Sequence, residues 1–500
     1  MAQTADAGGF SIDADWGRLY VDGEWVEASG GDTIAVEDPS TREAVAHVPR
    51  GTEADVDAAY EAAAAAQTEW AETPPARREE LVRNLLDLFD DHHDAVVDLM
   101  ATEAGQVEGL GETSVHLTED QIAEAATMPR RMKGEHAPSN VPGKENVVER
   151  VPQGVVTVIS PWNFPLNLSA RAVVPAVAAG NTVVLKPATN TPITGGLLFA
   201  RLFEAAGFPD GVLNVVTGHG SEIGDAVASH DHSDVVAFTG STEVGRRVAA
   251  AAGENLAEAA MELGGNNAHI VTAEADLDAA VDAGVFGSFA HQGQVCISIN
   301  RHLVQESVYD EYVEKLTERA ANLPAGSAHD HVVVGPIVDE AQRDEMLDYV
   351  ERTVEAGATL ETGGGTVELD GVADSLVVEP TVLSGVRNDM AAACNEHFGP
   401  IAPVVPFSDM DRAVELANDT AYGLSGSVHA GDVGAGKRIA RRLETGMVHV
   451  NDQPINDEAH VPFSGTGASG VGGYNTDDFL DEVTEKKWIS LQHEPREFPF

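Results

Sequence analysis

Cysteine is scarce in this chain of 500 residues, which contains only Cys296 and Cys394. Two thiols cannot cross-link a chain of this length, so a disulfide-stabilised secreted fold is excluded and a reducing, cytoplasmic location is expected. Long apolar runs are also lacking, because no stretch of about 18 apolar residues occurs, and no membrane span is predicted. Residues 1–20 are acidic where a secretory leader would be basic and then apolar, so no leader is predicted.

Basic residues are few, and lysine is the rarer of the two kinds. The chain has 30 Lys and Arg residues, of which seven are Lys, against 82 Asp and Glu, and its formal net charge is −52. This balance excludes a basic nucleic-acid-binding surface and a polybasic membrane patch. The acidic residues are spread through every segment rather than gathered in a tail. Because such a surface stays hydrated where salt screens its self-repulsion, we expect a salt-rich cytosol, as in an extreme halophile.

Apolar periodicity divides the chain into regions with different predicted structures. Its length predicts two or three domains, and its 43% hydrophobic content supplies buried cores that argue against disorder. Short strands and turns are predicted for residues 11–50, helices for 53–130, and a projecting hairpin for 131–150. Strands alternate with helices from residue 151 onward, which predicts a Rossmann-like parallel sheet, and a second alternating set over 268–450 predicts another α/β unit.

Three strand ends carry residues suited to holding phosphate or ribose groups. VVTGHGSEIG places Gly218, Gly220 and Gly224 between a strand and a helix, where glycine lets the backbone approach a pyrophosphate. The spacing G-x-G-x-x-x-G is a weak fingerprint, so ordinary turn glycines remain an alternative. FTGSTEVG puts Ser241 at the N-cap of the next helix. TVVLKP puts Lys186 at the end of another strand, where its ammonium would meet ribose hydroxyls or phosphate, or only solvent.

Four further residues combine chemical reactivity with an unusual local sequence. Cys296 has small and polar neighbours in GQVCISI, which favour a loop and a nucleophile, although a scarce cysteine is otherwise a small buried hydrophobe. Glu262 follows an apolar strand and precedes two glycines, so its carboxylate is expected to face a crevice and act as a general base. Asn163 stands between two prolines in PWNFP, which suits its amide to stabilising an oxyanion. Glu396, in NEHFGPI, is placed to anchor a ribose.

Six short motifs together resemble the NAD(P)-dependent aldehyde dehydrogenase superfamily. PWNFP, LKP, FTGSTEVG, MELGG, GQVC and EHFGP occur in the family's order and at similar separations over nearly the whole chain. GSFAHQGQVCIS, MELGGNNAHIV and the terminal KKWISLQ look most like the branch that oxidises benzaldehyde, vanillin and similar compounds. The resemblance implies an α/β fold with a Rossmann-like cofactor domain, a second α/β catalytic domain and a small β oligomerisation arm.

The implied fold divides the chain into three parts. Residues 1–130 and 151–262 would form the cofactor-binding domain, residues 263–455 the catalytic domain, and residues 131–150 with 484–492 the oligomerisation arm. Such arms pair by strand addition and otherwise leave an exposed edge, so a homodimer or homotetramer is expected.

The resemblance also implies a role for each candidate residue. Cys296 matches the nucleophile, whose thiolate would attack the aldehyde to form a thiohemiacetal, which becomes a thioester after hydride transfer to NAD or NADP. Asn163 and the backbone N–H of Cys296 would hold the oxyanion, and Glu262 matches the base that activates the hydrolytic water. The family uses no metal, and no Cys/His cluster in the sequence argues for one. The implied cofactor-binding residues are Trp162, Lys186, Thr189, Gly220, Gly224, Ser241, Glu396 and Phe398.

Two positions depart from the family's common pattern. Thr189 stands where NAD-preferring relatives often carry Glu, and its lack of charge removes a repulsion against a 2′-phosphate, so NADP or dual use is expected. Arg171 occupies a position that is often aromatic, and it would either meet a substrate carboxylate or be a buried structural partner. Phe164 and Phe463 would line an aromatic or apolar substrate pocket. Cys394 is interpreted as structural.

Other functions remain open beside the oxidation of a small-molecule aldehyde. A CoA-acylating dehydrogenase is one alternative, but such branches commonly lack the base equivalent to Glu262. A non-catalytic binding or structural protein on the same fold is another, which loss of the nucleophile would mark, and Cys296 is present. Esterase activity on activated esters is expected as a side reaction of the same thiolate. A Cys–His protease is disfavoured, because neither a His nor an Asn has a recognisable partner motif.

Overall fold

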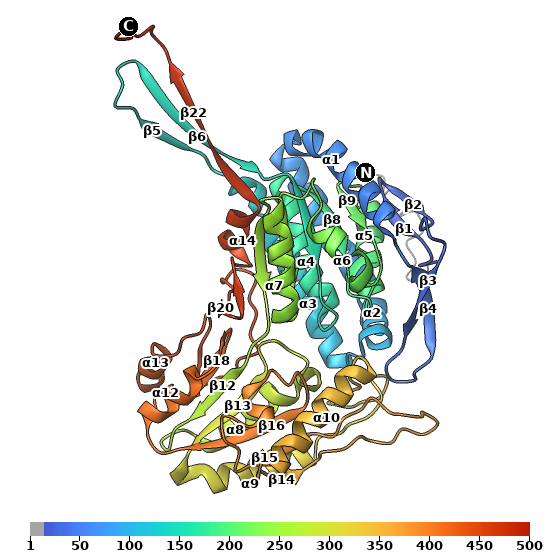
Figure 1. Ribbon diagram of the computed structural model, residues 1–500, viewed down its shortest axis with the longest axis vertical. Helices are drawn as coiled ribbons and strands as arrows, with labels where there is room; N and C mark the ends of the chain where they lie inside the picture. Colours follow the sequence, from blue (N-terminus) through green and yellow to red (C-terminus); the bar gives the residue numbers. More distant parts are fainter. Residues whose placement is uncertain (1–14) are drawn as a thin grey trace, which may run out of the picture.

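The computed structural model describes residues 15–500 and consists of two α/β units stacked on one another, with a narrow β arm projecting from the upper one (Figure 1). Residues 1–14 lie outside the described range. Most of the segment for which no leader was predicted, residues 1–20, falls there. So do the first four residues of the predicted strand region 11–50. None of the helices in residues 15–500 combines the length and apolar character that crossing a bilayer would require.

The upper unit is built on an eight-stranded sheet with the order β2-β1-β9-β8-β7-β10-β11-β21. Its five central strands, β9 to β11 in that order, run parallel, whereas the strands at both edges are antiparallel. The central strands are apolar and almost wholly buried, as expected for parallel strands with both faces covered. The strands are β1 (Leu19–Val21), β2 (Glu24–Val26), β7 (Val155–Ile159), β8 (Thr182–Lys186), β9 (Leu213–Val215), β10 (Val235–Thr239), β11 (Glu258–Glu262) and β21 (Gly470–Val471).

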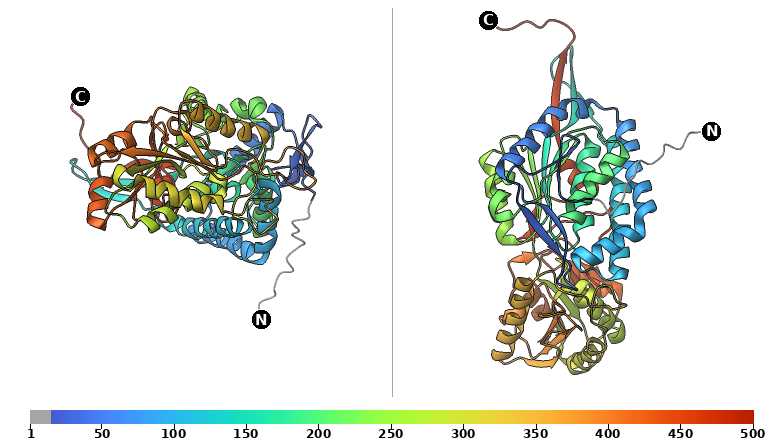
Figure 2. Two further views of the ribbon diagram at one scale, coloured as in Figure 1. Left: turned by 90° about the horizontal axis from the view of Figure 1, so that it is seen from below. Right: turned by 90° about the vertical axis from the view of Figure 1, so that its right-hand side faces the viewer.

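Helices cover both faces of this sheet (Figure 2). The helices α2 to α5 and α14 pack on one face, and α1, α6 and α7 pack on the other. The helix α4, which follows β7, is buried along all 15 of its residues, so it joins the sheet to the α2–α3 pair. The helices are α1 (Glu53–Glu72), α2 (Pro75–Ala104), α3 (Glu108–Ala125), η1 (Met128–Arg130), α4 (Pro165–Ala179), η2 (Ile193–Leu197), α5 (Leu198–Ala206), α6 (Gly220–Ala228), α7 (Thr242–Glu254) and α14 (Thr476–Glu482).

The lower unit contains a seven-stranded sheet with the order β14-β15-β16-β13-β12-β18-β19. All its neighbouring strands are parallel except β14, and helices again pack on both faces. Its strands are β12 (Asn267–Val271), β13 (Ile299–Gln305), β14 (Thr359–Thr362), β15 (Thr381–Ser384), β16 (Ile401–Phe407), β18 (Gly426–His429) and β19 (His449–Val450). Its helices are α8 (Leu277–Phe289), η3 (Ala290–Gly293), η4 (Glu306–Val308), α9 (Tyr309–Ala321), α10 (Glu340–Glu355), α11 (Ala391–Cys394), α12 (Met410–Asn418) and α13 (Val433–Ala440).

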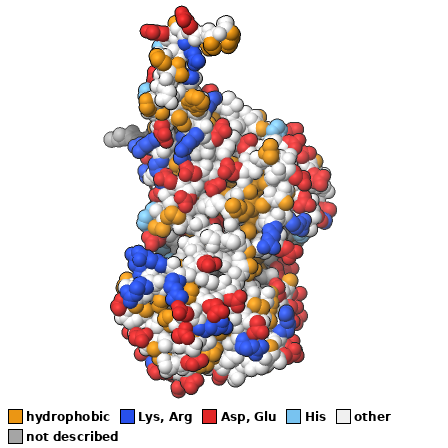
Figure 3. Space-filling model, turned by 60° about the vertical axis from the view of Figure 1, so that its left-hand side comes forward, with side chains coloured by type: hydrophobic (Ala, Val, Ile, Leu, Met, Phe, Trp, Pro, Cys, Tyr) orange, Lys and Arg blue, Asp and Glu red, His pale blue; other side chains and the backbone are white. Residues whose placement is uncertain are grey.

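The arm is a three-stranded antiparallel sheet with the order β22-β6-β5. The final strand β22 (Thr484–Gln492) pairs along its whole length with β6 (Lys144–Pro152), and β5 (Glu135–Pro138) completes the sheet. Two small ladders remain, β3 (Thr33–Glu37) with β4 (Ala44–Pro49), and β17 (Tyr422–Gly423) with β20 (Thr466–Gly467). Acidic side chains are scattered over the face of the molecule in Figure 3 rather than gathered in one block.

One local prediction needs correction. Gly224 was expected between a strand and a helix with Gly218 and Gly220, but it lies inside α6, which begins at Gly220. A Cβ atom at Gly220 or Gly224 would meet no atom within 4 Å, whereas one at Gly218 would come within 2.5 Å of Ile223. Of these three glycines, therefore, only Gly218 is closely packed.

Candidate active site

The parallel strands of the upper sheet bring several predicted site residues to one edge. Along the chain β7, β8 and β9 extend the sheet in one direction, and β10 and β11 extend it in the other, so the strand order reverses between β7 and β10. Ligands of such sheets bind outside the carboxyl ends of the strands near this reversal. Lys186 ends β8, Glu262 ends β11, and Asn163 follows β7, so all three lie at this edge.

Cys296 reaches the same edge from the lower unit. It lies in the turn between η3 and β13 and is half-buried. The three residues His291, Gln292 and Gly293 have φ angles of 50°, 56° and 72°, a left-handed conformation that costs non-glycine residues on the order of 1 kcal/mol or more each. A Cβ atom at Gly293 would lie 2.1 Å from the Gly399 carbonyl oxygen, so only glycine fits there. The chain therefore enters the cysteine turn through a strained and tightly packed segment.

Buried amides hold this segment in place. The Gln292 side-chain amide donates to the carbonyl oxygens of Gly105 (3.2 Å) and Pro336 (2.9 Å). The Gln294 side-chain oxygen accepts from the backbone N–H of Val338 at 3.0 Å. These contacts reach residues of both units. They hold the backbone before Cys296 in its left-handed conformation and offset the energetic cost of that conformation.

Asn163 is oriented by contacts to the same turn. Its side-chain amide donates to the Gln294 carbonyl oxygen at 2.9 Å, which uses one of its two N–H bonds. The backbone carbonyl oxygen of Asn163 accepts from the Gln106 side-chain amide at 2.9 Å. The Nε2 atom of His291 lies 2.7 Å from the same oxygen. Burial lowers the pKa of His291 to about 4, so the ring is neutral and donates through Nε2. Gln106 and His291 thus fix the Asn163 loop, and sequence reasoning identified neither of them.

Glu262 and Cys296 are both in their neutral forms at neutral pH. Burial raises the pKa of Glu262 to about 8, and the Arg171 charge and the Gly465 amide only partly offset this. Neither carboxylate oxygen of Glu262 has a hydrogen-bond partner of ordinary geometry in the described chain. Burial likewise raises the pKa of the Cys296 thiol to about 12, with Arg171 again the opposing charge. A carboxyl group with a pKa near 8 and no fixed partner is suited to exchanging protons with water.

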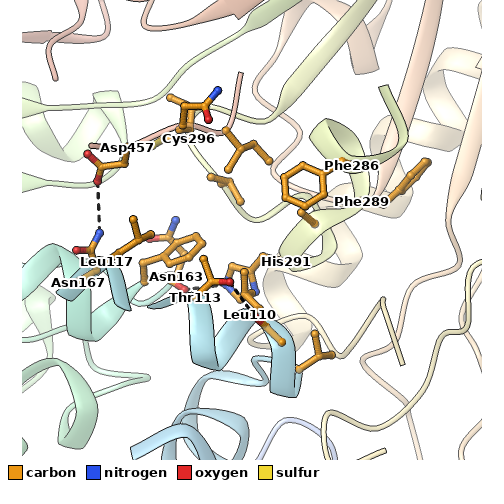
Figure 4. Close-up of a pocket in the computed structure, with 18 of the residues that line it drawn as sticks. Leu110, Thr113, Leu117, Asn163, Asn167, Phe286, Phe289, His291, Cys296 and Asp457 are labelled. Atoms are coloured by element: carbon orange, nitrogen blue, oxygen red, sulfur yellow. Dashed lines mark hydrogen bonds between the residues drawn. The ribbon is translucent and has the colours of Figure 1, made fainter. Parts of the chain in front are cut away.

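A cavity of about 560 Å³ leads to Cys296. Side chains from α3, α4 and α8 face one another around it, with Cys296 on its far side (Figure 4). Most of its wall is apolar, including Leu110, Leu117, Phe164, Phe286, Phe289 and Phe463. Phe164 meets the ring of His291 edge-on at 5.1 Å. The predicted pocket residues Phe164, Arg171 and Phe463 all line this cavity, whose size and apolar wall suit a small aromatic molecule.

Arg171 resolves into a buried ion pair that sequence did not show. One of its terminal nitrogens lies 3.2 Å from the Asp457 carboxylate, and only 2% of its side chain is exposed. Its guanidinium lies over the rings of Phe463 (4.3 Å) and Tyr474 (5.5 Å), both cation–π arrangements. The sequence left Arg171 either as a ligand for a substrate carboxylate or as a buried structural partner. The geometry favours the structural partner, because the Asp457 carboxylate already pairs with the guanidinium.

The residues predicted to bind a dinucleotide form a fitting cradle. Burial lowers the pKa of Lys186 to about 8, and its ammonium donates to one acceptor, the Pro187 carbonyl oxygen at 3.1 Å. No acidic side chain in residues 15–500 forms an ion pair with it, so its other N–H bonds are free for hydroxyl or phosphate oxygens. Glu396 accepts from the Gly265 amide at 2.8 Å, and a Cβ atom at Gly264 would come within 2.1 Å of its carboxylate. Gly264 therefore leaves the space that Glu396 needs.

The remaining predicted cofactor residues lie around the same strand ends. Ser241 caps α7, its Oγ accepting from the Val244 amide at 3.4 Å, and is exposed. Thr189 donates to the Gly218 carbonyl oxygen at 3.2 Å. The rings of Trp162 and Phe398 meet edge-on at 5.4 Å, with Phe398 at a φ of 51°. Cys394, in contrast, is exposed at the end of α11 and does not line the cavity.

Comparison with known proteins gives one consistent result. The Aldehyde dehydrogenase family matches residues 25–489. A vanillin dehydrogenase of Corynebacterium glutamicum is 42% identical over 478 residues, covering 95% of this chain and 97% of the relative. A benzaldehyde dehydrogenase [NAD(+)] of Pseudomonas putida is 42% identical over 487 residues, covering 97% and 98%. The crystal structure of betaine aldehyde dehydrogenase from Staphylococcus aureus in complex with NAD+ superimposes with a TM-score of 0.94 at 33% identity, covering 96% of each chain.

Proposed function

The chain belongs to the aldehyde dehydrogenase family, and we propose that it oxidises an uncharged aromatic aldehyde to the carboxylic acid, with NAD or NADP as the oxidant. One observation carries the choice of substrate. The cavity that ends at Cys296 has an apolar and aromatic wall of a size suited to a substituted benzaldehyde. The relatives named as vanillin and benzaldehyde dehydrogenases support the same class.

The site residues divide the proposed reaction between them. Cys296 Sγ attacks the aldehyde carbon after its thiol proton has passed to water, and Arg171 is the nearby charge that favours the thiolate. The second N–H of the Asn163 amide and the backbone N–H of Cys296 hold the oxyanion of the thiohemiacetal. Glu262 then removes a proton from the water that hydrolyses the thioester, which releases the acid and restores the thiol.

The cofactor would be held by residues at the strand ends. Lys186 and Glu396 are placed to bind ribose hydroxyls, and the exposed start of α7 at Ser241 offers backbone N–H groups to a pyrophosphate. When bound, the nicotinamide ring supplies the hydride acceptor.

A turnover assay tests this function directly. The protein, in about molar KCl, is mixed with NAD or NADP and with benzaldehydes, straight-chain aldehydes or semialdehydes, and reduced nicotinamide is followed by its absorbance. Selective turnover of benzaldehydes is expected, and Cys296→Ala should abolish both this turnover and the hydrolysis of activated esters. Cys394→Ala is the matched control and should retain both. Oxidation by the Cys296→Ala protein would disprove the nucleophile, and a product that forms only with coenzyme A would favour the acylating alternative.

We also propose a domain organisation and setting for the enzyme. The cofactor-binding domain is assigned to residues 1–130 and 151–262, the catalytic domain to 263–455, and the oligomerisation arm to 131–150 with 484–492. Within residues 15–500 the outer edges of β5 and β22 have no neighbouring strand, which supports a homodimer or homotetramer formed by strand pairing. The net charge of −52 supports a salt-rich cytosol, as in a halophile.

A further inference from the structure

The cavity contains few charged groups, and their arrangement is unusual. Of the side chains that line it, only Arg171, Asp282 and Asp457 carry a charge at neutral pH, because His291 is neutral. Among the described residues, Arg171 is therefore the only cation of the cavity wall. Its charge is balanced by Asp457 at 3.2 Å, whereas Asp282 is largely exposed and pairs with Arg319 outside the cavity wall.

Asp457 is fixed from its other side, so the ion pair cannot easily open. Its second carboxylate oxygen accepts from the Asn475 side-chain amide at 2.8 Å. The oxygen of that amide accepts from Gln121 on α3 at 3.0 Å, which anchors Asn475 to the opposite helix. Arg171 is meanwhile sandwiched against Phe463 and Tyr474. A buried pair held at both ends keeps its geometry when a ligand enters.

We propose that Asp457 is a specificity-determining residue that neutralises Arg171 and so excludes aldehydes bearing a second carboxylate. This inference rests on the proposed function and names the chemistry that the same cavity rejects. A carboxylate that enters the cavity loses its hydration, finds no uncompensated cation and faces the Asp457 carboxylate. An uncharged aromatic ring of the same size loses little hydration free energy on entry, because the cavity wall is apolar. Specificity here comes from a repulsive element as much as from an attractive one.

The unmodified enzyme provides the first test. Benzaldehyde is compared with 3- and 4-carboxybenzaldehyde, which add a carboxylate to the same ring, at one concentration of KCl and of cofactor. We expect kcat/KM to be at least about 100-fold lower for both carboxylated substrates, the size of effect that an unpaired buried charge produces. Comparable turnover of benzaldehyde and either carboxylated substrate would overturn the inference. Failure of every aldehyde to react would instead overturn the proposed function.

The Asp457→Asn variant provides the second test. The amide keeps an oxygen for Asn475 and nearly the same volume, but it leaves the Arg171 charge free to meet a carboxylate. We expect the ratio of kcat/KM for a carboxylated substrate to that for benzaldehyde to rise at least about tenfold for one or both isomers. Using the ratio matters, because the Asp457 charge also raises the pKa of both Cys296 and Glu262, and such effects on the chemical steps are shared by both substrates.

Two further variants separate the ion pair from general charge effects. Asp282→Asn removes the same charge from the wall of the cavity, but its side chain is 65% exposed and pairs with Arg319, so the ratio should change by less than about threefold. The double variant Arg171→Met with Asp457→Asn lacks the freed cation, so it should lose the gain. A gain of equal size in Asp282→Asn, or its persistence in the double variant, would contradict the assignment.

A binding measurement tests the same inference without turnover. Terephthalate and benzoate are the products expected from 4-carboxybenzaldehyde and benzaldehyde. Each is added to the folded protein, and the thermal midpoint of the protein is measured. Terephthalate should raise the midpoint of Asp457→Asn but not that of the unmodified enzyme, whereas benzoate should act on both alike. Stabilisation of the unmodified enzyme by terephthalate as strong as that by benzoate would overturn the inference, even if Asp457→Asn does not fold.

Discussion

At the residue scale, the protonation state of Glu262 links the structure to a measurable rate. Its pKa is raised to about 8 because the carboxyl group is buried, so most of it is protonated at pH 7. Only the ionised carboxylate can accept a proton from the hydrolytic water. The rate of thioester hydrolysis should therefore rise with pH up to about 8 and level off above it.

Glu262→Gln tests this role. The amide cannot accept the proton, so steady-state turnover should fall by roughly 10²- to 10⁴-fold. The pH profile of the rate should also no longer rise toward pH 8. Oxidation before hydrolysis should still occur, so rapid mixing should show a burst of reduced nicotinamide close to one per active site. Glu258→Gln, at the exposed start of the same strand β11, is the control and should behave like the unmodified enzyme. An unchanged steady state in Glu262→Gln would show that another base acts.

Thr189 gives a second prediction at this scale, on the choice between NAD and NADP. It is uncharged and donates to the Gly218 carbonyl oxygen, beside the strand ends at which the cofactor is proposed to bind. Thr189→Glu would place a negative charge there and repel a 2′-phosphate, so we expect KM for NADP to rise at least about tenfold and that for NAD to change less than about threefold. Thr189→Gln supplies the same length without charge. Fluorescence titration of the reduced cofactors checks binding apart from turnover, and equal effects on both cofactors would contradict the prediction.

Residues that act through distant partners mark the limit of what the sequence predicts. Cys296, Glu262, Asn163 and Lys186 stand in distinctive local sequences, and the structure brings them to one edge. Asp457 has no such local signal, because its meaning depends on Arg171, 286 residues away in sequence. The partner of a buried charge is set by tertiary packing, and the periodicity of a segment does not contain it. For this reason the sequence left two interpretations of Arg171 open.

At the element scale, continuous apolar runs were the most informative feature. GVVTVIS, TVVLKP and DVVAFTG each become a buried central strand, as parallel strands with both faces covered should. The edge strand β21, only two residues of glycine and valine, was not predicted, because so short a segment has no period. It pairs with β11 beside Glu262, because the chain comes back from the lower unit to the upper sheet at this point. No local sequence pattern predicts such a long-range pairing.

The packing of α8 and α9 on β13 predicts an acid sensitivity. His302 of β13 lies between Ser288 of α8 and Tyr312 of α9, each at 2.8 Å from a ring nitrogen, and burial lowers its pKa from 6.5 to about 3. Between pH 6.5 and about 3, His302 binds a proton in the unfolded chain but stays neutral in the folded chain. The folded state therefore loses about 1.4 kcal/mol of stability for each pH unit below 6.5 through this group.

His302→Gln should remove that dependence. The variant will be less stable at pH 7.5, because Ser288 and Tyr312 lose a well-placed partner, but its thermal midpoint should fall less steeply than that of the unmodified enzyme between pH 6.5 and 4.5. Measurements at constant KCl keep surface charge effects equal in both proteins. His460→Gln, at a side chain that is 70% exposed, is the control and should follow the unmodified enzyme. Parallel pH profiles for His302→Gln would contradict the prediction.

At the scale of the whole molecule, the arm predicts how copies associate. Trp488 on β22 is 66% exposed, an unusual position for a tryptophan in a single chain, and no strand of the described part of the chain pairs with the outer edge of β22. If a second copy covers the arm, Trp488→Lys should weaken association at least about tenfold, as measured by analytical ultracentrifugation over a range of concentrations. Val433→Lys replaces an equally exposed apolar residue on α13 and should leave association unchanged. A monomer of 52.5 kDa for the unmodified enzyme would contradict the proposal of a homo-oligomer.

The net charge of −52 predicts a dependence on salt that belongs to the molecule as a whole. The distance over which charges repel is about 30 Å at 0.01 M salt and about 3 Å at 1 M, so at low salt each acidic group repels others across a whole domain. Dialysis from about 2 M KCl to about 0.01 M should lower the thermal midpoint and abolish turnover, and returning the salt should reverse the change. Because the cause is screening, choline chloride at equal ionic strength should restore stability as well as KCl does. Rescue by potassium alone would indicate ion binding at defined sites instead, and full stability at 0.01 M would show that this acidic surface needs no salt-rich cytosol.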